Sequence, residues 1–134
     1  MKNLISAVGL IVLAVWIIAA EDVTGRWSVK NTIVQDGKTE ENYSYAVLKQ
    51  KGTELTGTIG PDAAHQWPIS KAKSEATKDG QAVQFTVEHT TNDGSFSFTA
   101  TYDVRLVKGH LVGHVKTLAD GKTVESGVDF ERIK

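Results

Sequence analysis

Four histidines are the side chains most suited to bind a metal or move a proton. His110 and His114 have the spacing that puts two ligands on one face of a helix, but apolar and polar residues alternate around them, which indicates a strand. On a strand the two rings lie about 13 Å apart at ~3.3 Å per residue. Zinc needs ligand nitrogens within about 2.1 Å, so we predict no joint metal site. The alternation predicts that His114 faces solvent and that His89 lies at a barrel rim, and His65 is expected in a loop.

Nucleophilic catalysis has no visible basis in the chain. There is no cysteine and no G-x-S-x-G motif, and Ser95 and Ser97 occupy outward strand positions. A serine nucleophile needs an activating base within reach, and the carboxylates are scattered over turns and outward positions. No glycine cluster opens a helix as a phosphate-binding loop would. We therefore predict that the protein is not an enzyme, with no catalytic residue, no metal and no cofactor.

Aromatic residues provide the main candidates for binding. Large rings recur on the inward side of alternating segments, at Trp27, Trp67, Phe85, Phe96, Phe98, Tyr102 and Phe130. They either form a filled core or line a pocket for a flat apolar molecule, with Gln50 and Ser126 as polar partners. The candidate ligand-binding residues of the interior are Trp27, Gln50, Trp67, Phe85, Phe98, Tyr102 and Ser126.

Turn signals divide residues 21–134 into eight segments of strand length. Asp-Gly pairs favour type I′ hairpin turns because both central residues need positive φ. The seven breaks are Asp36-Gly37, Lys51-Gly52, Gly60-Pro61-Asp62, Asp79-Gly80, Asp93-Gly94, Lys108-Gly109 and Asp120-Gly121. We expect residues 70–78 to be a strand end followed by a loop.

The segments alternate with a period of two, which is typical of antiparallel strands with one buried face. Eight consecutive strands leave two edges unless they close, and closure removes the edges. We therefore predict an all-β, eight-stranded up-and-down barrel, with a two-sheet sandwich as the alternative. The residues expected in its core are Val83, Phe85, Val87, Phe96, Phe98, Leu111, Val128 and Phe130.

Residues 1–20 differ in composition from the rest. Lys2 is their only charge, and residues 4–20 are almost wholly apolar. This pattern predicts a secretory signal peptide at 1–20, with an uncleaved membrane anchor as the alternative, followed by a single domain at 21–134. The protein is then exported, to the periplasm or beyond the cell. Lys2 is one of the 15 basic residues, so the domain at 21–134 has 14 basic and 16 acidic residues. This charge balance does not favour nucleic acid as a partner, and it favours no membrane contact other than through residues 1–20.

Two motifs resemble the signature of the calycin superfamily, which includes lipocalins and avidins. Gly25-Arg26-Trp27 opens the first segment, and Arg132 ends the last. The stretch 48–58, LKQKGTELTGT, is similar to uncharacterised exported bacterial domains of lipocalin type. The resemblance implies a barrel closed at one end by Gly25, Trp27 and Arg132, and it favours the face of Ala46 and Leu48 as the interior rather than that of Tyr43 and Tyr45.

Two functions fit this reading. The first is an exported, lipocalin-like barrel that binds a small hydrophobic ligand inside. The second is a filled barrel that acts as a structural, interaction or inhibitor module through its loops or outer face. Alternation shows where a side chain points and not how completely the space is filled, so the sequence leaves both functions, and the oligomeric state, open.

Overall fold

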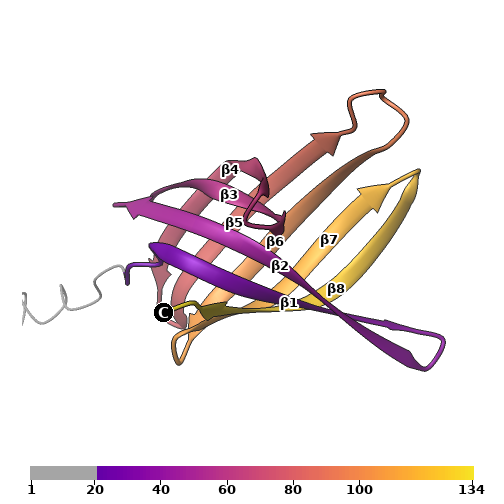
Figure 1. The fold of residues 1–134 in the computed structure, drawn as a ribbon. Coiled ribbons are helices and arrows are strands. Elements are labelled where there is room, and N and C mark those ends of the chain that lie inside the picture. Colours follow the sequence, from indigo (N-terminus) through magenta and orange to yellow (C-terminus); the bar gives the residue numbers. More distant parts are fainter. Residues whose placement is uncertain (1–20) are drawn as a thin grey trace, which may run out of the picture.

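The computed structural model describes residues 21–134, and the expected signal segment lies outside them. Eight antiparallel strands follow one another around a closed barrel, and the last pairs with the first (Figure 1). This confirms the predicted up-and-down barrel. Among these residues there is no helix with the length and hydropathy to cross a membrane. The strands are β1 (Gly25–Gln35), β2 (Lys38–Lys51), β3 (Glu54–Asp62), β4 (His65–Thr77), β5 (Gly80–Thr90), β6 (Ser97–Val107), β7 (His110–Ala119) and β8 (Lys122–Arg132).

Three of the predicted tight turns have the backbone of type I′. Both central residues have positive φ at Asp36-Gly37 (52° and 76°), Lys108-Gly109 (51° and 83°) and Asp120-Gly121 (51° and 73°). This twist matches that of the flanking strands, which is why two-residue connections suffice there.

Two predicted boundaries and one predicted core residue were wrong. The break at residues 60–62 lies inside β3, and the turn follows at residues 63–64. Residues 70–77 continue β4 instead of forming a loop, because a β-bulge between Ser70 and Lys73, with Lys71 at a φ of 50°, shifts the alternation. Phe96 belongs to the connection before β6 and is 40% exposed, since the strand alternation does not extend to it.

The barrel interior is packed with apolar side chains from every strand except β4, whose Trp67, Ile69 and Ala72 pack against that core. Trp27, Phe85 and Phe130 are fully buried, and Phe130 meets the other two rings edge-on at centroid distances of 6.4 and 6.3 Å. A ring of this kind buries about 150–250 Å², which at ~25 cal/mol/Å² stabilises the fold by about 4–6 kcal/mol before entropy losses. Ala46 and Leu48 face inward as expected, and Tyr43 faces out.

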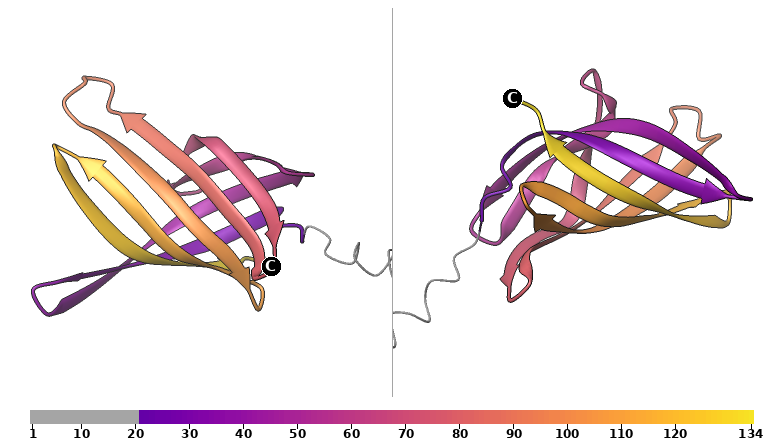
Figure 2. Two further views of the ribbon diagram at one scale, coloured as in Figure 1. Left: turned by 180° about the vertical axis from the view of Figure 1, so that it is seen from behind. Right: turned by 90° about the horizontal axis from the view of Figure 1, so that it is seen from below.

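The two ends of the barrel differ. The turns β2–β3, β4–β5 and β6–β7 lie at one end with residue 21 and the C-terminus; we call it the sealed end (Figures 1 and 2). The turns β1–β2, β3–β4, β5–β6 and β7–β8 lie at the other, the open end. All strands therefore run between a sealed and an open end, as the up-and-down order requires.

One hairpin extends beyond the rest of the barrel at the open end. β1 pairs with β8 only from Trp27 to Thr32, and β2 pairs with β3 only from Tyr45 onward. Residues 33–44, which we call the ribbon, therefore pair only within the β1–β2 hairpin and with neither β8 nor β3, and they project away from β8 in Figure 1. The ribbon leaves one side of the open end without a continuous wall.

Candidate functional site

The sealed end is closed by the pair that the sequence predicted. The Arg132 guanidinium lies over the Trp27 indole, 4.4 Å from its centroid, and Trp27 Nε1 donates a hydrogen bond to Val23 O at 3.0 Å. Arg132 also donates to the carbonyls of Asp22 and Thr24. Gly25 has a φ of 149°, which side-chain-bearing residues rarely adopt, and a Cβ there would lie 3.0 Å from Arg132 Nη1, so Gly25 lies beneath the guanidinium rather than beneath the indole ring.

Residues 21–24 act as a plug at the sealed end, which the sequence did not predict. Val23 is fully buried, and its N–H donates to Gln50 Oε1 at 3.0 Å. The Glu21 N–H donates to Gln81 Oε1 at 3.1 Å, while Ser74 links the two glutamines. The amide of Gln50 therefore holds the plug and lies far from the open end. The calycin resemblance favoured the face of Gln50 as the interior, but neither it nor the alternation specifies the height of a residue along the barrel.

A cavity of about 460 Å³ occupies the open end of the interior. Its apolar wall consists of Ile59, Trp67, Val87, Phe98, Ala100, Tyr102 and Val115, and its polar wall of Asn31, Asn42, Ser44, Thr117 and Ser126. Ile33, Tyr43, Gly60 and Pro61 complete the lining, and no charged residue belongs to it. The interior is therefore filled at the sealed end and hollow at the open end.

Four of the seven candidate binding residues meet at this cavity, namely Trp67, Phe98, Tyr102 and Ser126. Trp27 and Gln50 lie at the sealed end instead. Phe85 is not part of the lining, and its ring stacks on Tyr102 with centroids 4.7 Å apart and planes 18° apart. The polar residues of β1 and β2 in the lining were missed, because Asn31 and Ser44 look like ordinary inward strand positions in the sequence.

Two buried hydroxyls project into the cavity. Tyr102 and Ser126 are only 7% and 8% exposed, and no hydrogen bond within residues 21–134 involves either hydroxyl. Every side-chain N or O atom in that range that is fully shielded from solvent has a hydrogen-bond partner. The hydroxyl oxygens of Tyr102 and Ser126 have no partner there, so they must retain some accessible surface, and this surface faces the cavity. Burial raises the pKa of Tyr102 to about 12, so its hydroxyl stays protonated and can donate. Asn31, also buried, donates to Ser44 Oγ at 3.3 Å beside them.

Stacked aromatic rings form the rim next to β4 and β5. Trp67 and His89 stack with centroids 4.3 Å apart, and Phe98 meets Trp67 edge-on at 5.7 Å. Phe96 extends the cluster outward, 6.2 Å from Phe98. His89 is thus a rim residue, as predicted. The cluster holds the half-buried Trp67 in one orientation at the entrance, which favours flat apolar molecules there.

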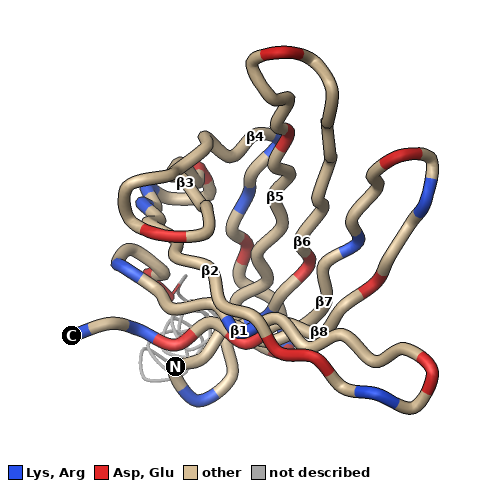
Figure 3. Tube along the Cα trace, turned by 45° about the vertical axis from the view of Figure 1, so that its right-hand side comes forward, with Lys and Arg blue, Asp and Glu red and all other residues tan. Residues whose placement is uncertain are grey.

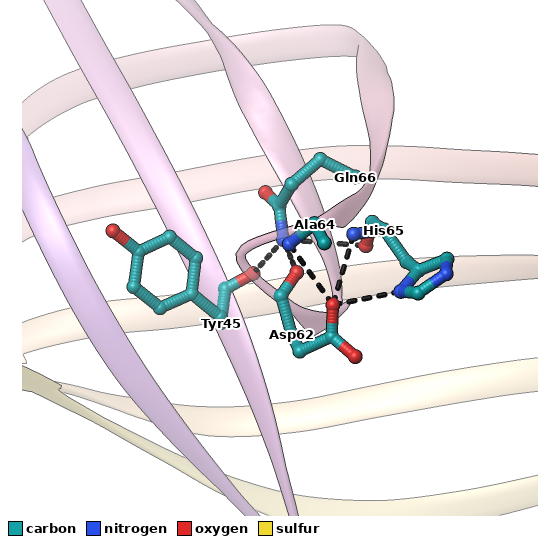
Figure 4. A network of polar contacts seen from close by, with 5 residues as sticks. All are labelled: Tyr45, Asp62, Ala64, His65 and Gln66. Atoms are coloured by element: carbon teal, nitrogen blue, oxygen red, sulfur yellow. Dashed lines mark hydrogen bonds and ion pairs between the residues drawn. The ribbon is translucent and has the colours of Figure 1, made fainter.

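The β3–β4 turn is held in place beside the cavity by Asp62 (Figure 4). Asp62 Oδ1 accepts hydrogen bonds from the backbone N–H groups of Ala64 and His65 at 2.9 Å, and it lies 2.8 Å from His65 Nδ1. The hydrogen bond with His65 lowers the pKa of Asp62, so the carboxylate stays ionised. Gln66 Nε2 donates to the carbonyls of Tyr45 and Asp62. These contacts make the short β3–β4 hairpin a firm part of the rim.

A second histidine–carboxylate pair, besides His65 and Asp62, lies on the outside of the barrel. His110 Nδ1 is 2.8 Å from Asp129 Oδ1 on the outer face, and this hydrogen bond raises the pKa of His110. His114 is exposed. Within residues 21–134, no group of three or more His, Cys, Asp or Glu residues is placed to hold a metal ion.

The open-end cavity is thus an uncharged, half-apolar site with hydroxyl and amide groups along one wall. Such a site can exclude water from an apolar body and hydrogen-bond a polar edge. No family model, no curated protein and no solved structure matches this chain. The functional case therefore rests on the geometry of the cavity.

Proposed function

We propose that this protein is an exported, non-enzymatic, lipocalin-like barrel that binds one small, largely apolar molecule in its open-end cavity. The observation that carries the proposal is the cavity itself, into which two hydroxyls without a hydrogen-bond partner among residues 21–134 project. Its volume of about 460 Å³ lies within the ~300–1,000 Å³ typical of small-molecule sites. The contact of Trp27 with Arg132 adds support, because it matches the barrel closure that the calycin resemblance implies.

The apolar body of the ligand is proposed to lie against Trp67, Phe98 and Tyr102. Its polar edge then meets Asn31 and Ser126 on the opposite wall. Removing apolar surface from water supplies most of the affinity at about 25 cal/mol/Å², while the hydroxyls fix orientation because leaving them unpaired costs free energy.

Native mass spectrometry of the protein purified from its own host tests this proposal directly. A bound small molecule, released on denaturation, is expected. In parallel, the neutral fluorescent probe N-phenyl-1-naphthylamine is titrated into the wild type, into Ala100→Phe, which fills the cavity, and into Thr101→Phe, which adds the same ring on the outer face. Affinity should fall at least tenfold in the first variant only. Equal binding by all three proteins would contradict the cavity as the site.

The second candidate function, interaction with another protein, is favoured by one observation. The ribbon projects from the barrel and exposes two large apolar side chains, Val34 at 67% and Tyr43 at 62%. The ribbon variant Val34→Ser should leave probe binding intact, because Val34 does not belong to the cavity lining. If it abolishes the biological effect of the protein and cavity filling does not, the interaction function is the correct one.

A further inference from the structure

Acidic residues mark the open end of the barrel. Three of its four connections contain an aspartate, namely Asp36, Asp93 and Asp120, and Asp62 is the last residue of β3 before the fourth. At the sealed end the connections contain Lys78, Asp79 and Lys108, and Lys51 is the last residue of β2. Figure 3 shows acidic residues at the tips of the open-end hairpins. The open-end turns therefore carry more negative charge than the sealed-end turns, and this charge acts on an approaching molecule.

Turn geometry does not explain this difference. The Lys108-Gly109 turn at the sealed end has the same positive φ angles as Asp36-Gly37 and Asp120-Gly121 at the open end. A lysine is thus accepted at the first position of this turn type in the same molecule. Backbone conformation therefore does not require aspartate at the open-end turns.

Glu40 brings this negative charge next to the cavity. It pairs in register with Ile33, which belongs to the cavity lining. Ile33 also lines a smaller groove of about 190 Å³, together with Gln35, Asp36, Lys38 and Glu40. The groove therefore adjoins the cavity at Ile33 and runs along the inner side of the ribbon, with one more acidic than basic residue in its lining. Glu41 points to the other side of the ribbon, where its carboxylate lies 3.9 Å from Lys30 Nζ.

The cavity interior supplies the second, independent indication of a ligand. Tyr102 and Ser126 are more than nine-tenths buried as residues, and their hydroxyls face the cavity and have no hydrogen-bond partner within residues 21–134. No lysine, arginine or histidine belongs to the lining. An anionic ligand would thus find no counter-charge in the cavity. A cationic group in the groove would meet two carboxylates, Asp36 and Glu40, against one ammonium, Lys38.

We infer that the ligand is an amphipathic monocation, whose flat apolar body occupies the cavity and whose ammonium or guanidinium group lies in the groove beside Glu40. The inference rests on the proposed function and adds the charge class of the ligand. Because Glu40 is solvent-exposed, its pairing with a cation is worth only about threefold to fivefold in affinity, and the surrounding acidic turns add a contribution that salt screens.

Three naphthalenes of nearly equal size test the inference. Calorimetric titrations of the protein at low and at 0.5 M salt compare 1-naphthylmethylammonium, 1-naphthylmethanol and 1-naphthylacetate. We expect the affinity order cation, neutral, anion at low salt, with the differences shrinking at high salt. Equal or tighter binding of the neutral compound would overturn the inference and leave the cavity function standing. Absence of binding by all three would overturn both.

Glu40→Gln and Glu41→Gln form a matched pair, since both remove one negative charge from adjacent residues of the ribbon. Glu40→Gln should reduce the advantage of the cation over the neutral compound by about threefold to fivefold and leave binding of the neutral compound unchanged. Glu41→Gln should keep most of that advantage. Equal losses in both variants would show that position in the groove is irrelevant and would overturn the role assigned to Glu40.

Discussion

At the residue scale, the two ends of the barrel use similar side chains for different purposes. Trp27 at the sealed end is fully buried beneath Arg132, whereas Trp67 at the open end is half-buried and lines the cavity. Gln50 and Ser126 are both inward polar residues, yet Gln50 holds the plug and Ser126 faces the cavity. The role of a residue here depends on its height along the barrel axis.

Truncation of the sealing pair should affect stability and not binding. Trp27→Ala is expected to lower the free energy of unfolding by about 3–5 kcal/mol, as for other large core truncations. Arg132→Ala should cost less, because it removes a stacking contact worth about 0.5–2 kcal/mol and side-chain packing. Urea denaturation measures both, and probe titration serves as the control. Weaker probe binding in Arg132→Ala at unchanged stability would contradict a purely sealing role.

The pair of His110 and Asp129 should make stability depend on pH. The hydrogen bond to Asp129, helped by the charges of Asp129 and Glu131, raises the pKa of folded His110 above its ordinary value of 6.5. Folding therefore favours protonation, so the stabilisation is complete below about pH 6.5 and is lost as pH rises through the raised value. NMR titration should show the pKa of His110 falling toward 6.5 in Asp129→Asn. An unchanged pKa in that variant would rule out the pair as the cause.

At the element scale, the hairpins around the open end differ in length and support. The ribbon is paired only within the β1–β2 hairpin, whereas the short β3–β4 hairpin is held by Asp62 and by a close approach of its strands. Gly60 is the point of closest approach, since a Cβ there would lie 1.7 Å from the backbone oxygen of His65. The open end thus combines one extended wall with one low, tightly packed wall.

Gly60→Ala should therefore disturb the β3–β4 hairpin. The backbone of His65 has to move to admit the methyl group, at a cost of about 1–3 kcal/mol, and the adjacent cavity wall should bind probe more weakly. Gly127→Ala in β8 is the control, because a Cβ there meets nothing closer than Thr32 O at 4.0 Å. Thermal melts and probe titration compare the two. Equal effects would show that the close approach at Gly60 is unimportant.

At the scale of the whole molecule, closure joins the two ends of the chain. β1 and β8 pair from Trp27↔Arg132 to Thr32↔Gly127, so contacts about one hundred residues apart complete the barrel. Long-range pairings of this kind form late and slowly, because loop-closure entropy opposes them until other contacts form. The barrel should thus behave as one cooperative unit.

Deletion of residues 129–134 tests this cooperativity. The deletion removes Phe130, Arg132 and most of the β1–β8 ladder, so we expect no cooperative urea transition and loss of probe binding. Deletion of Lys134 alone is the control and should leave a single sharp transition. A cooperative transition in the longer deletion would show that seven strands suffice for the fold.

The sequence alone predicted the eight strands and the buried face of most of them, and it favoured a closed barrel over a two-sheet sandwich. The strands and their faces follow from short-range rules, a period of two for a half-buried strand and positive φ at hairpin turns, whereas the closure at Trp27 and Arg132 was implied by the calycin resemblance. Where a local irregularity interrupts the period, as at the bulge near Lys71 or in the connection that contains Phe96, the same rules failed.

Only the tertiary structure decided how the interior is divided. The alternation identifies Trp27, Phe85, Tyr102 and Ser126 as inward residues, but whether they touch one another or leave space depends on side-chain volumes summed over eight strands. Side chains around Trp27 fill the sealed end, and residues 21–24 plug it. The walls at the open end stay apart, leaving a cavity of about 460 Å³. The total volume that the side chains fill cannot be predicted from a local sequence pattern, because packing density is a property of the assembled core.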